Sequence, residues 1–207
     1  MRLELIPFDW QDLSRDLADE RFDVAMGGIY ITDERLQTLT VSHSYYQSPV
    51  SLIVRSDRAS DFLERDAIIA MPKLRLAVFD DPVVVPMVRR LFPEATIEVV
   101  PDYNVLPAMS DRIDAAIWTL EQARSWAAAH PGFTAVAPAG MGGPILFAYL
   151  LPRDADSLRR YLDQWLELKI SDGFRHAQVD YWIKGKRRAE RRPRWNLLDA
   201  LLSAQHG

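Results

Sequence analysis

Short apolar segments with strand character alternate with helical segments along most of this chain. The clearest example begins with the apolar run Leu74–Phe79 and continues with a helical pattern over Val84–Leu91, which ends before Pro93. Such alternation is typical of βαβ units and of mainly parallel sheets covered by helices, so we expect an α/β fold. The other expected strands are Leu3–Pro7, Phe22–Met26, Val50–Arg55, Thr96–Val100, Asp114–Trp118, Phe133–Ala137 and Ile145–Leu151. The other expected helices are Trp10–Ala18, Val105–Ser110, Glu121–Ala129, Asp156–Ser171 and Phe174–Ile183.

Composition excludes several classes of function. The formal net charge of −4 argues against nucleic acid as the main partner, and the absence of cysteine excludes disulfides and cysteine-based metal sites. The four histidines are scattered without metal-ligand spacing, and neither a Gly-x-Ser-x-Gly motif nor a phosphate-binding loop occurs. We therefore expect no catalytic constellation, no metal and no cofactor.

The segment Phe22–Arg35 carries a candidate site for an anion. Its strand is followed by Gly27 and Gly28, which allow positive φ angles or close approach of a ligand to the backbone. Thr32 is a suitable N-cap for a helix that holds Arg35 one turn later. A guanidinium near the free N–H groups of a helix N-terminus suits a carboxylate, which it grips through two hydrogen bonds. The alternative is a surface arginine paired with an acidic neighbour.

This segment, together with Ser42-His-Ser-Tyr-Tyr46, resembles the signature of the bacterial extracellular solute-binding proteins of the polar amino acid type. That resemblance implies a periplasmic-binding-protein-like fold of type II, in which two Rossmann-like lobes are joined by two hinge strands. It also implies that Arg35 binds the ligand carboxylate and that Gly27 and Gly28 face the ligand. Tyr30 stands where the family has a small Ser or Thr, so it either narrows the pocket, offers a phenolic hydrogen bond or packs as a structural residue.

The resemblance also implies a division of the chain. In the family, one strand and one helix precede the strand that we expect at Leu3–Pro7, so we expect the first lobe to be incomplete at its N-terminus. The expected parts are a first lobe over 1–50 plus 152–184, a second lobe over 57–146, hinge strands over 51–56 and 147–151, and a basic linker with a C-terminal helix over 185–207.

The second lobe departs from the family pattern at two places. Asp80 and Asp81 replace the usual Gly-Thr-Thr, and two carboxylates there would repel a ligand carboxylate, although they also suit a helix N-cap. Thr119 stands where amino-acid binders carry the Asp that pairs with the ammonium group, and Glu121 follows two residues later. We expect an anionic amino acid, a dicarboxylate or a related carboxylate as the ligand.

Nearly the whole chain also resembles a narrower group, the binding domains fused to cation–dicarboxylate symporters. The segments that carry this resemblance include Tyr181-Trp-Ile-Lys-Gly-Lys186 and Pro193-Arg-Trp-Asn-Leu197. The implied partner is a membrane transporter, either an ABC permease or a fused symporter, and the implied location is extracytoplasmic. The segment Met1–Pro7 has no signal-peptide pattern, which taken alone predicts a cytoplasmic protein. The basic tail either makes a weak contact with anionic lipid or serves as a solvated connector.

Three functions compete at this point. The first is a non-enzymatic domain that captures a small carboxylate for transport. The second is an enzyme of the cyclohexadienyl dehydratase type on the same fold, with Asp80, Asp81 or Glu121 as the proton donor. The third is a degenerate sensor or structural module that binds no ligand. We favour the first, because no second catalytic group is visible beside these acids.

Overall fold

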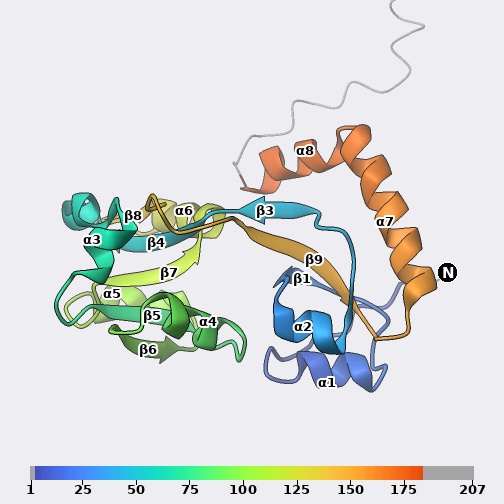
Figure 1. The fold of residues 1–207 in the computed structure, drawn as a ribbon. Coiled ribbons are helices and arrows are strands. Elements are labelled where there is room, and N and C mark those ends of the chain that lie inside the picture. Colours follow the sequence, from blue (N-terminus) through green and yellow to red (C-terminus); the bar gives the residue numbers. More distant parts are fainter. Residues whose placement is uncertain (1–2, 184–207) are drawn as a thin grey trace, which may run out of the picture.

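The computed structural model describes residues 3–183, which form two β-sheets side by side with helices on their faces (Figure 1). We call them sheet A, which includes strands from both ends of the described chain, and sheet B, built from its middle. The C-terminal part expected at 185–207, with its lipid contact, lies outside the described residues. No helix within residues 3–183 is both long and apolar enough to cross a membrane.

Sheet B has five strands in the order β6-β5-β7-β4-β8. Its strands β5, β6 and β7 are parallel, whereas β4 runs antiparallel to both of its neighbours. Side chains of β5 alternate between two cores, with Leu76 and Val78 on one face of the sheet and Ala77 on the other. The strands are β4 (Val50–Arg55), β5 (Arg75–Phe79), β6 (Thr96–Val100), β7 (Ala115–Thr119) and β8 (Phe133–Val136).

Sheet A is built around β9 (Ile145–Leu151), which inserts between β1 (Ala25–Tyr30) on one side and β2 (Thr40–Val41) and β3 (Tyr46–Ser48) on the other. Every pairing in it is antiparallel. The expectation of mainly parallel sheets is therefore wrong for sheet A. The reason is that β9 arrives from the far end of the chain in the opposite direction and separates β1 from β2, which would otherwise be parallel neighbours.

Two further expectations about the N-terminal strands need correction. Residues Leu3–Pro7 form no strand, and Leu3 and Leu5 are mostly exposed because no strand within residues 3–183 pairs with them. The strand expected at Phe22–Met26 instead runs through both glycines to Tyr30. It does so with an irregular register between Ala25 and Ile29, where Gly28 has a φ of 71°. A bulge at a glycine with positive φ lets the strand continue past the expected turn.

The helices lie close to their expected positions. Val84–Leu91 and Asp156–Ser171 have the expected bounds, and Gly173, with a φ of 75°, separates the latter from the final helix. The α-helices are α1 (Leu13–Ala18), α2 (Asp33–Thr38), α3 (Arg65–Ile69), α4 (Val84–Leu91), α5 (Leu106–Met109), α6 (Leu120–Ala129), α7 (Asp156–Ser171) and α8 (Phe174–Gln178). Segments of 3₁₀ helix cover Ser56–Phe62 and Tyr103–Val105, and a π-helical turn covers Val179–Ile183.

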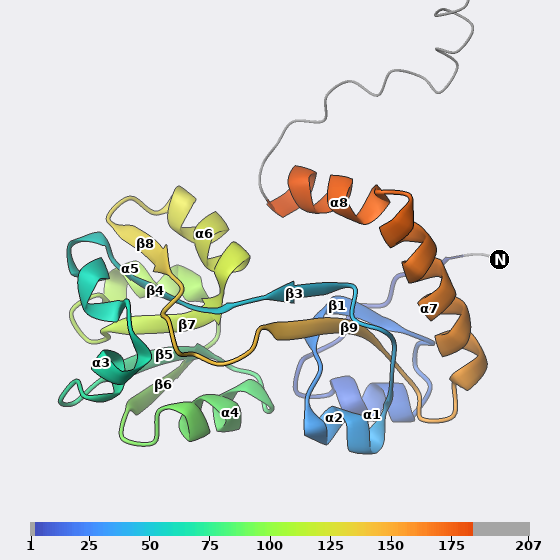
Figure 2. The same ribbon diagram turned by 45° about the horizontal axis from the view of Figure 1, so that its top comes forward.

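The two halves are connected by β3 and β9, which run side by side between them (Figure 2). The chain passes from β3 in sheet A to β4 in sheet B at Pro49, and it returns through residues 137–144 to β9. The segments expected as hinges, 51–56 and 147–151, thus lie largely within β4 and β9. The lobe boundaries remain a prediction. From the strand pairing, the chain passes from one sheet to the other just before β4 and again just before β9.

Asp114 ties sheet B together at the start of β7. Its carboxylate accepts hydrogen bonds from the backbone N–H of Arg75 at 2.9 Å and from the guanidinium groups of Arg75 and Arg58 at 2.9–3.2 Å. Burial alone would raise the pKa of Asp114, but these hydrogen bonds outweigh it and hold the pKa below its usual value. The ionised form is therefore the one that stabilises the fold.

We expect Asp114→Asn to lower the free energy of unfolding by about 1.5–3 kcal/mol, the usual worth of hydrogen bonds to charged groups. Because the folded pKa is depressed, the wild-type advantage is complete above the carboxyl group's ordinary pKa and declines as the pH falls through the folded value. Urea denaturation of both proteins at neutral pH and in acid measures this difference. A constant difference at every pH would contradict the assigned role of the charge.

Candidate functional site

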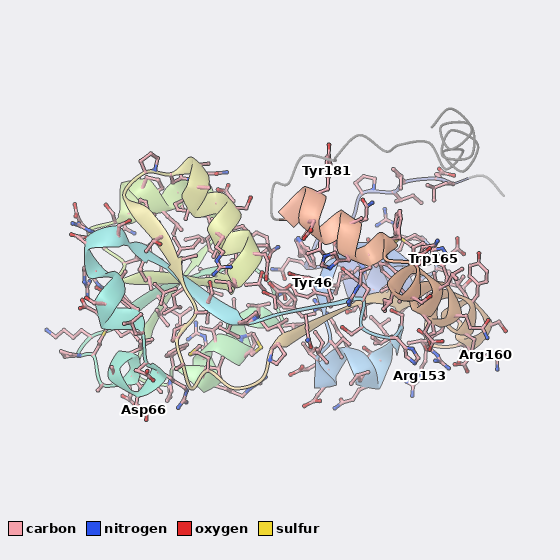
Figure 3. The ribbon with its side chains drawn as sticks, turned by 90° about the horizontal axis from the view of Figure 1, so that it is seen from above. Tyr46, Asp66, Arg153, Arg160, Trp165 and Tyr181 are labelled. Atoms are coloured by element: carbon pink, nitrogen blue, oxygen red, sulfur yellow. The ribbon has the colours of Figure 1, made fainter. Side chains whose placement is uncertain are left out.

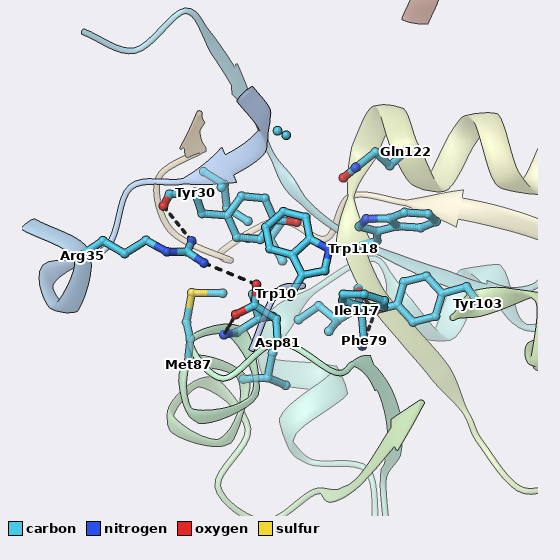
Figure 4. A pocket seen from close by; sticks show the side chains of 16 residues that line it. Trp10, Tyr30, Arg35, Phe79, Asp81, Met87, Tyr103, Ile117, Trp118 and Gln122 are labelled. Carbon is cyan, nitrogen blue, oxygen red and sulfur yellow. Dashed lines mark hydrogen bonds and ion pairs between the residues drawn. The ribbon is translucent and has the colours of Figure 1, made fainter. Parts of the chain in front are cut away.

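A cavity of about 200 Å³ lies between the two halves and is lined by residues of both (Figure 4). Sheet A and the segment before it contribute aromatic and glycine residues together with Arg35, and sheet B contributes Asp81 and further aromatic residues. The lining residues with the clearest chemical roles are Trp10, Gly27, Gly28, Tyr30, Arg35, Phe79, Asp81, Tyr103, Trp118 and Gln122.

Arg35 is buried, with only 3% of its surface exposed. As expected, Thr32 is the N-cap of α2, and its Oγ1 accepts a hydrogen bond from the Arg35 backbone N–H. The guanidinium donates from Nη1 to the Tyr30 carbonyl at 2.9 Å, and its Nη2 lies 3.5 Å from Oδ2 of Asp81. Burial lowers the pKa of Arg35, and the Asp81 carboxylate opposes this effect. The alternative of a surface arginine does not hold.

Asp81 is equally buried and faces Arg35 from the other half of the molecule. Its Oδ1 accepts hydrogen bonds from the backbone N–H groups of Val83 at 2.8 Å and Val84 at 3.1 Å, so it caps the start of α4. Its neighbour Asp80 accepts a hydrogen bond from Nε2 of Gln11 at 3.0 Å. The capping role that we considered for these acids thus holds for Asp81.

Tyr30 and the two glycines form the wall of the cavity on the side of sheet A. The ring of Tyr30 packs edge-on against Phe147 with 5.1 Å between centroids, and burial, assisted by Asp81, raises its pKa. A Cβ atom at Gly27 would lie 3.1 Å from the ring of Phe8, and Gly28 needs its positive φ. The sequence-predicted residues Gly27, Gly28, Tyr30, Arg35 and Asp81 therefore gather around one cavity.

Thr119 and Glu121 lie elsewhere. Both line a second cavity of about 460 Å³, which is bounded by α6, α7, α8 and the aromatic residues of β3 and β9. Thr119 is buried and donates a hydrogen bond to Oε1 of Gln122. Glu121 accepts a hydrogen bond from Ser48, and burial together with Glu121 raises the pKa of Tyr46 to about 12. In this arrangement Glu121 ties β3 to α6.

Five of the lining residues named above were missed in the sequence: Trp10, Phe79, Tyr103, Trp118 and Gln122. Trp10 was expected as the first residue of a helix, and its ring lies 6.5 Å from that of Phe79 in an edge-on contact between the two halves. Phe79 and Trp118 could have been found from their positions in the sequence. They stand near the ends of two parallel strands of one sheet, where ligand sites of α/β folds form.

Within residues 3–183, no three acidic or histidine side chains gather to hold a metal ion.

Tyr103 fixes the loop that carries Asp81. Its hydroxyl donates to the Ile117 carbonyl at 2.5 Å and accepts from the Phe79 backbone N–H at 3.0 Å, and burial raises its pKa.

We expect Tyr103→Phe to lower the free energy of unfolding by about 1–3 kcal/mol, because two buried backbone groups lose their partner while the ring volume stays. Chemical denaturation measures the loss. Unchanged stability would show that these groups find other partners.

The chain is similar in sequence to a family of binding proteins and to one enzyme. The family model of bacterial extracellular solute-binding proteins, family 3, matches residues 1–185. A cyclohexadienyl dehydratase of Pseudomonas aeruginosa strain PAO1 is 29% identical over 188 residues, which are 88% of this chain and 68% of that protein.

Solved structures of low sequence identity share the fold. An amino acid ABC transporter substrate-binding protein, AbpA from Streptococcus pneumoniae, bound to L-arginine, is 17% identical with a TM-score of 0.78, covering 87% of this chain and 76% of that one. The ancestral amino acid-binding protein AncCDT-1, a precursor of cyclohexadienyl dehydratase, is 20% identical with a TM-score of 0.75 and the same coverage. The expected α/β fold of the periplasmic-binding-protein type is thereby confirmed.

Proposed function

Since this chain belongs to the bacterial extracellular solute-binding proteins of family 3, we propose that it captures a small organic solute in the cavity between its two halves and that Arg35 holds a carboxylate of that solute. Closure of the halves around the solute would shift an equilibrium between open and closed forms. In this proposal Gly27, Gly28 and Tyr30 shape the wall beside the solute.

One observation carries the proposal. The Nε–H of the buried Arg35 has no hydrogen-bond partner among residues 3–183, and Nη2 reaches Asp81 only at 3.5 Å. These two N–H groups lie on the same edge of the guanidinium, the edge that grips a carboxylate with two parallel hydrogen bonds. A buried donor without an acceptor is costly, so a carboxylate at this edge would supply what Arg35 lacks.

Location and partner follow from the family rather than from the site. We propose an extracytoplasmic protein that delivers its solute to a membrane transporter, either an ABC permease or a symporter to which the chain is fused. The extracellular character of the family and the ABC transporter named for the Streptococcus pneumoniae relative support this proposal.

A thermal-shift screen tests the proposal directly. We expect one compound among amino acids, dicarboxylates and aromatic carboxylates to raise the melting temperature by several degrees, because a ligand that binds only the folded state stabilises it. Amides of the same acids serve as matched controls without the carboxylate and should give a much smaller shift. Absence of any shift across the panel would contradict capture of a carboxylate and favour the ligand-free sensor or structural module.

The dehydratase relative makes an enzyme the second candidate. A dehydratase needs a proton donor beside the leaving hydroxyl. Asp81 is the acid in the cavity, but its oxygens accept from Arg35 and from the backbone at α4, which are contacts of an acceptor. Glu121 lies in the other cavity. These contacts favour binding over catalysis. Incubation with a cyclohexadienyl carboxylate, followed by ultraviolet absorbance of an aromatic product, would support the enzyme if turnover occurs.

A further inference from the structure

We infer that Asp81 is a specificity-determining residue that competes with the solute for Arg35 and that latches the two halves together when no solute is bound. Its carboxylate faces the guanidinium from the opposite half, at the position where the carboxylate of a solute would sit. The predicted effect on solute affinity rests on the proposed function. The predicted effect on the separation of the two halves does not.

The contact between Arg35 and Asp81 is one of several that join the same two surfaces. The segment from the end of β5 to α4 faces the segment before α1 and the start of α2. All of these contacts are made between side chains of the two halves. The contacting pairs are Arg35 with Asp81 at 3.5 Å, Gln11 with Asp80 at 3.0 Å, Arg90 with Glu34 at 3.6 Å, and Trp10 with Phe79 at 6.5 Å between rings.

Burial makes the central pair the decisive one. The side chains of Arg35 and Asp81 are 3% and 6% exposed, whereas those of Arg90 and Glu34 are 65% and 53% exposed. An exposed pair contributes little, but a buried charge without a partner is costly. A solute carboxylate that binds Arg35 would bring a second negative charge beside Asp81. Competition of this kind weakens the binding of anions relative to a site without the charge at position 81.

The geometry also allows the latch to open. Asp81 is anchored in its own half by two backbone hydrogen bonds at 2.8 and 3.1 Å, both shorter than its 3.5 Å contact with Arg35. Arg35 is likewise anchored in its own half through the Tyr30 carbonyl. Separation of the halves would therefore break the ion pair while the cap of α4 and the position of the guanidinium persist.

Asp81→Asn removes the charge and keeps a side-chain oxygen that can cap α4. We expect it to bind succinate and L-glutamate about tenfold more tightly in calorimetric titrations, because the competing charge is gone. Asp80→Asn is the matched control, since it removes the neighbouring charge, which contacts Gln11 rather than Arg35. Asp81→Ser serves as a second variant that can also cap the helix.

The separation of the halves is measured as the distance between two spin labels. The labels are attached to cysteines introduced in place of Asp66 and Arg160, which lie at opposite ends of the molecule (Figure 3). The chain has no cysteine of its own, so labelling is specific. We expect longer and broader distances in the Asp81→Asn background without solute. Wild-type distances are expected in the Asp80→Asn background, because the amide oxygen can still accept the hydrogen bond from Gln11.

The outcomes separate this inference from the proposed function. Longer spin-label distances together with tighter carboxylate binding in Asp81→Asn support both the latch and the competition for Arg35. Wider distances without binding of any carboxylate to either protein would keep the latch and overturn the proposed function. Wild-type distances together with wild-type affinities in both Asp81 variants would overturn the latch and leave the proposed function standing.

Discussion

Alanine at position 35 is expected to weaken carboxylate binding by about 2 kcal/mol or more, which is roughly 30-fold in affinity. Arg35 is buried, and its unpartnered Nε–H and loosely held Nη2–H form the free edge that the proposed site offers to a carboxylate. Calorimetric titration with the compound found by thermal shift measures the loss. The variant should still fold, because α2 is capped by Thr32 rather than by the guanidinium.

Two further substitutions make this result specific. Arg35→Lys keeps the positive charge but offers no planar edge, so we expect most of the affinity to be lost in it as well. Arg90→Ala removes an exposed arginine that pairs with Glu34, and it should leave binding within about twofold of wild type. If Arg35→Ala bound the solute with wild-type affinity, the proposed site would be wrong.

The part of the site that could be predicted from the sequence is the part that is local in the chain. Thr32 and Arg35 lie within one helical turn, so the cap and the position of the arginine follow from short-range rules. Gly28 likewise has the positive φ that two adjacent glycines permit. The pairing of Arg35 with Asp81 spans 46 residues and joins separate halves, so it depends on how those halves pack. No local pattern contains that information.

The same distinction applies to the fold. Strands β5 and β7 of sheet B were predicted closely because buried parallel strands are continuous apolar runs flanked by helices. Leu3–Pro7 has an equally regular alternation, yet a strand also requires a partner, which it lacks within residues 3–183. The antiparallel sheet A was missed for a related reason. Its central strand β9 comes from the distant end of the described chain, and periodicity carries no information about direction.

The largest loss of stability is expected from Leu150→Ala in β9. Leu150 is fully buried and packs in a core with Leu13, Leu17 and Ile29. Its strand is the one to which the other strands of sheet A pair, so the cavity left by the missing side chain lies at the centre of that half. We expect a loss of about 3 kcal/mol in the free energy of unfolding, measured by urea denaturation and circular dichroism.

Leu146→Ala in the same strand is the matched control. Leu146 is 40% exposed and lies near the crossing between the halves, so the same change in volume should cost less than about 1 kcal/mol. Equal losses in the two variants would contradict the assignment of β9 as the buried centre of sheet A. The comparison also bears on the site, because β1 pairs with β9 and the Tyr30 carbonyl of β1 accepts the hydrogen bond that positions Arg35. A loosened β9 would therefore weaken solute binding even though Leu150 does not line the cavity.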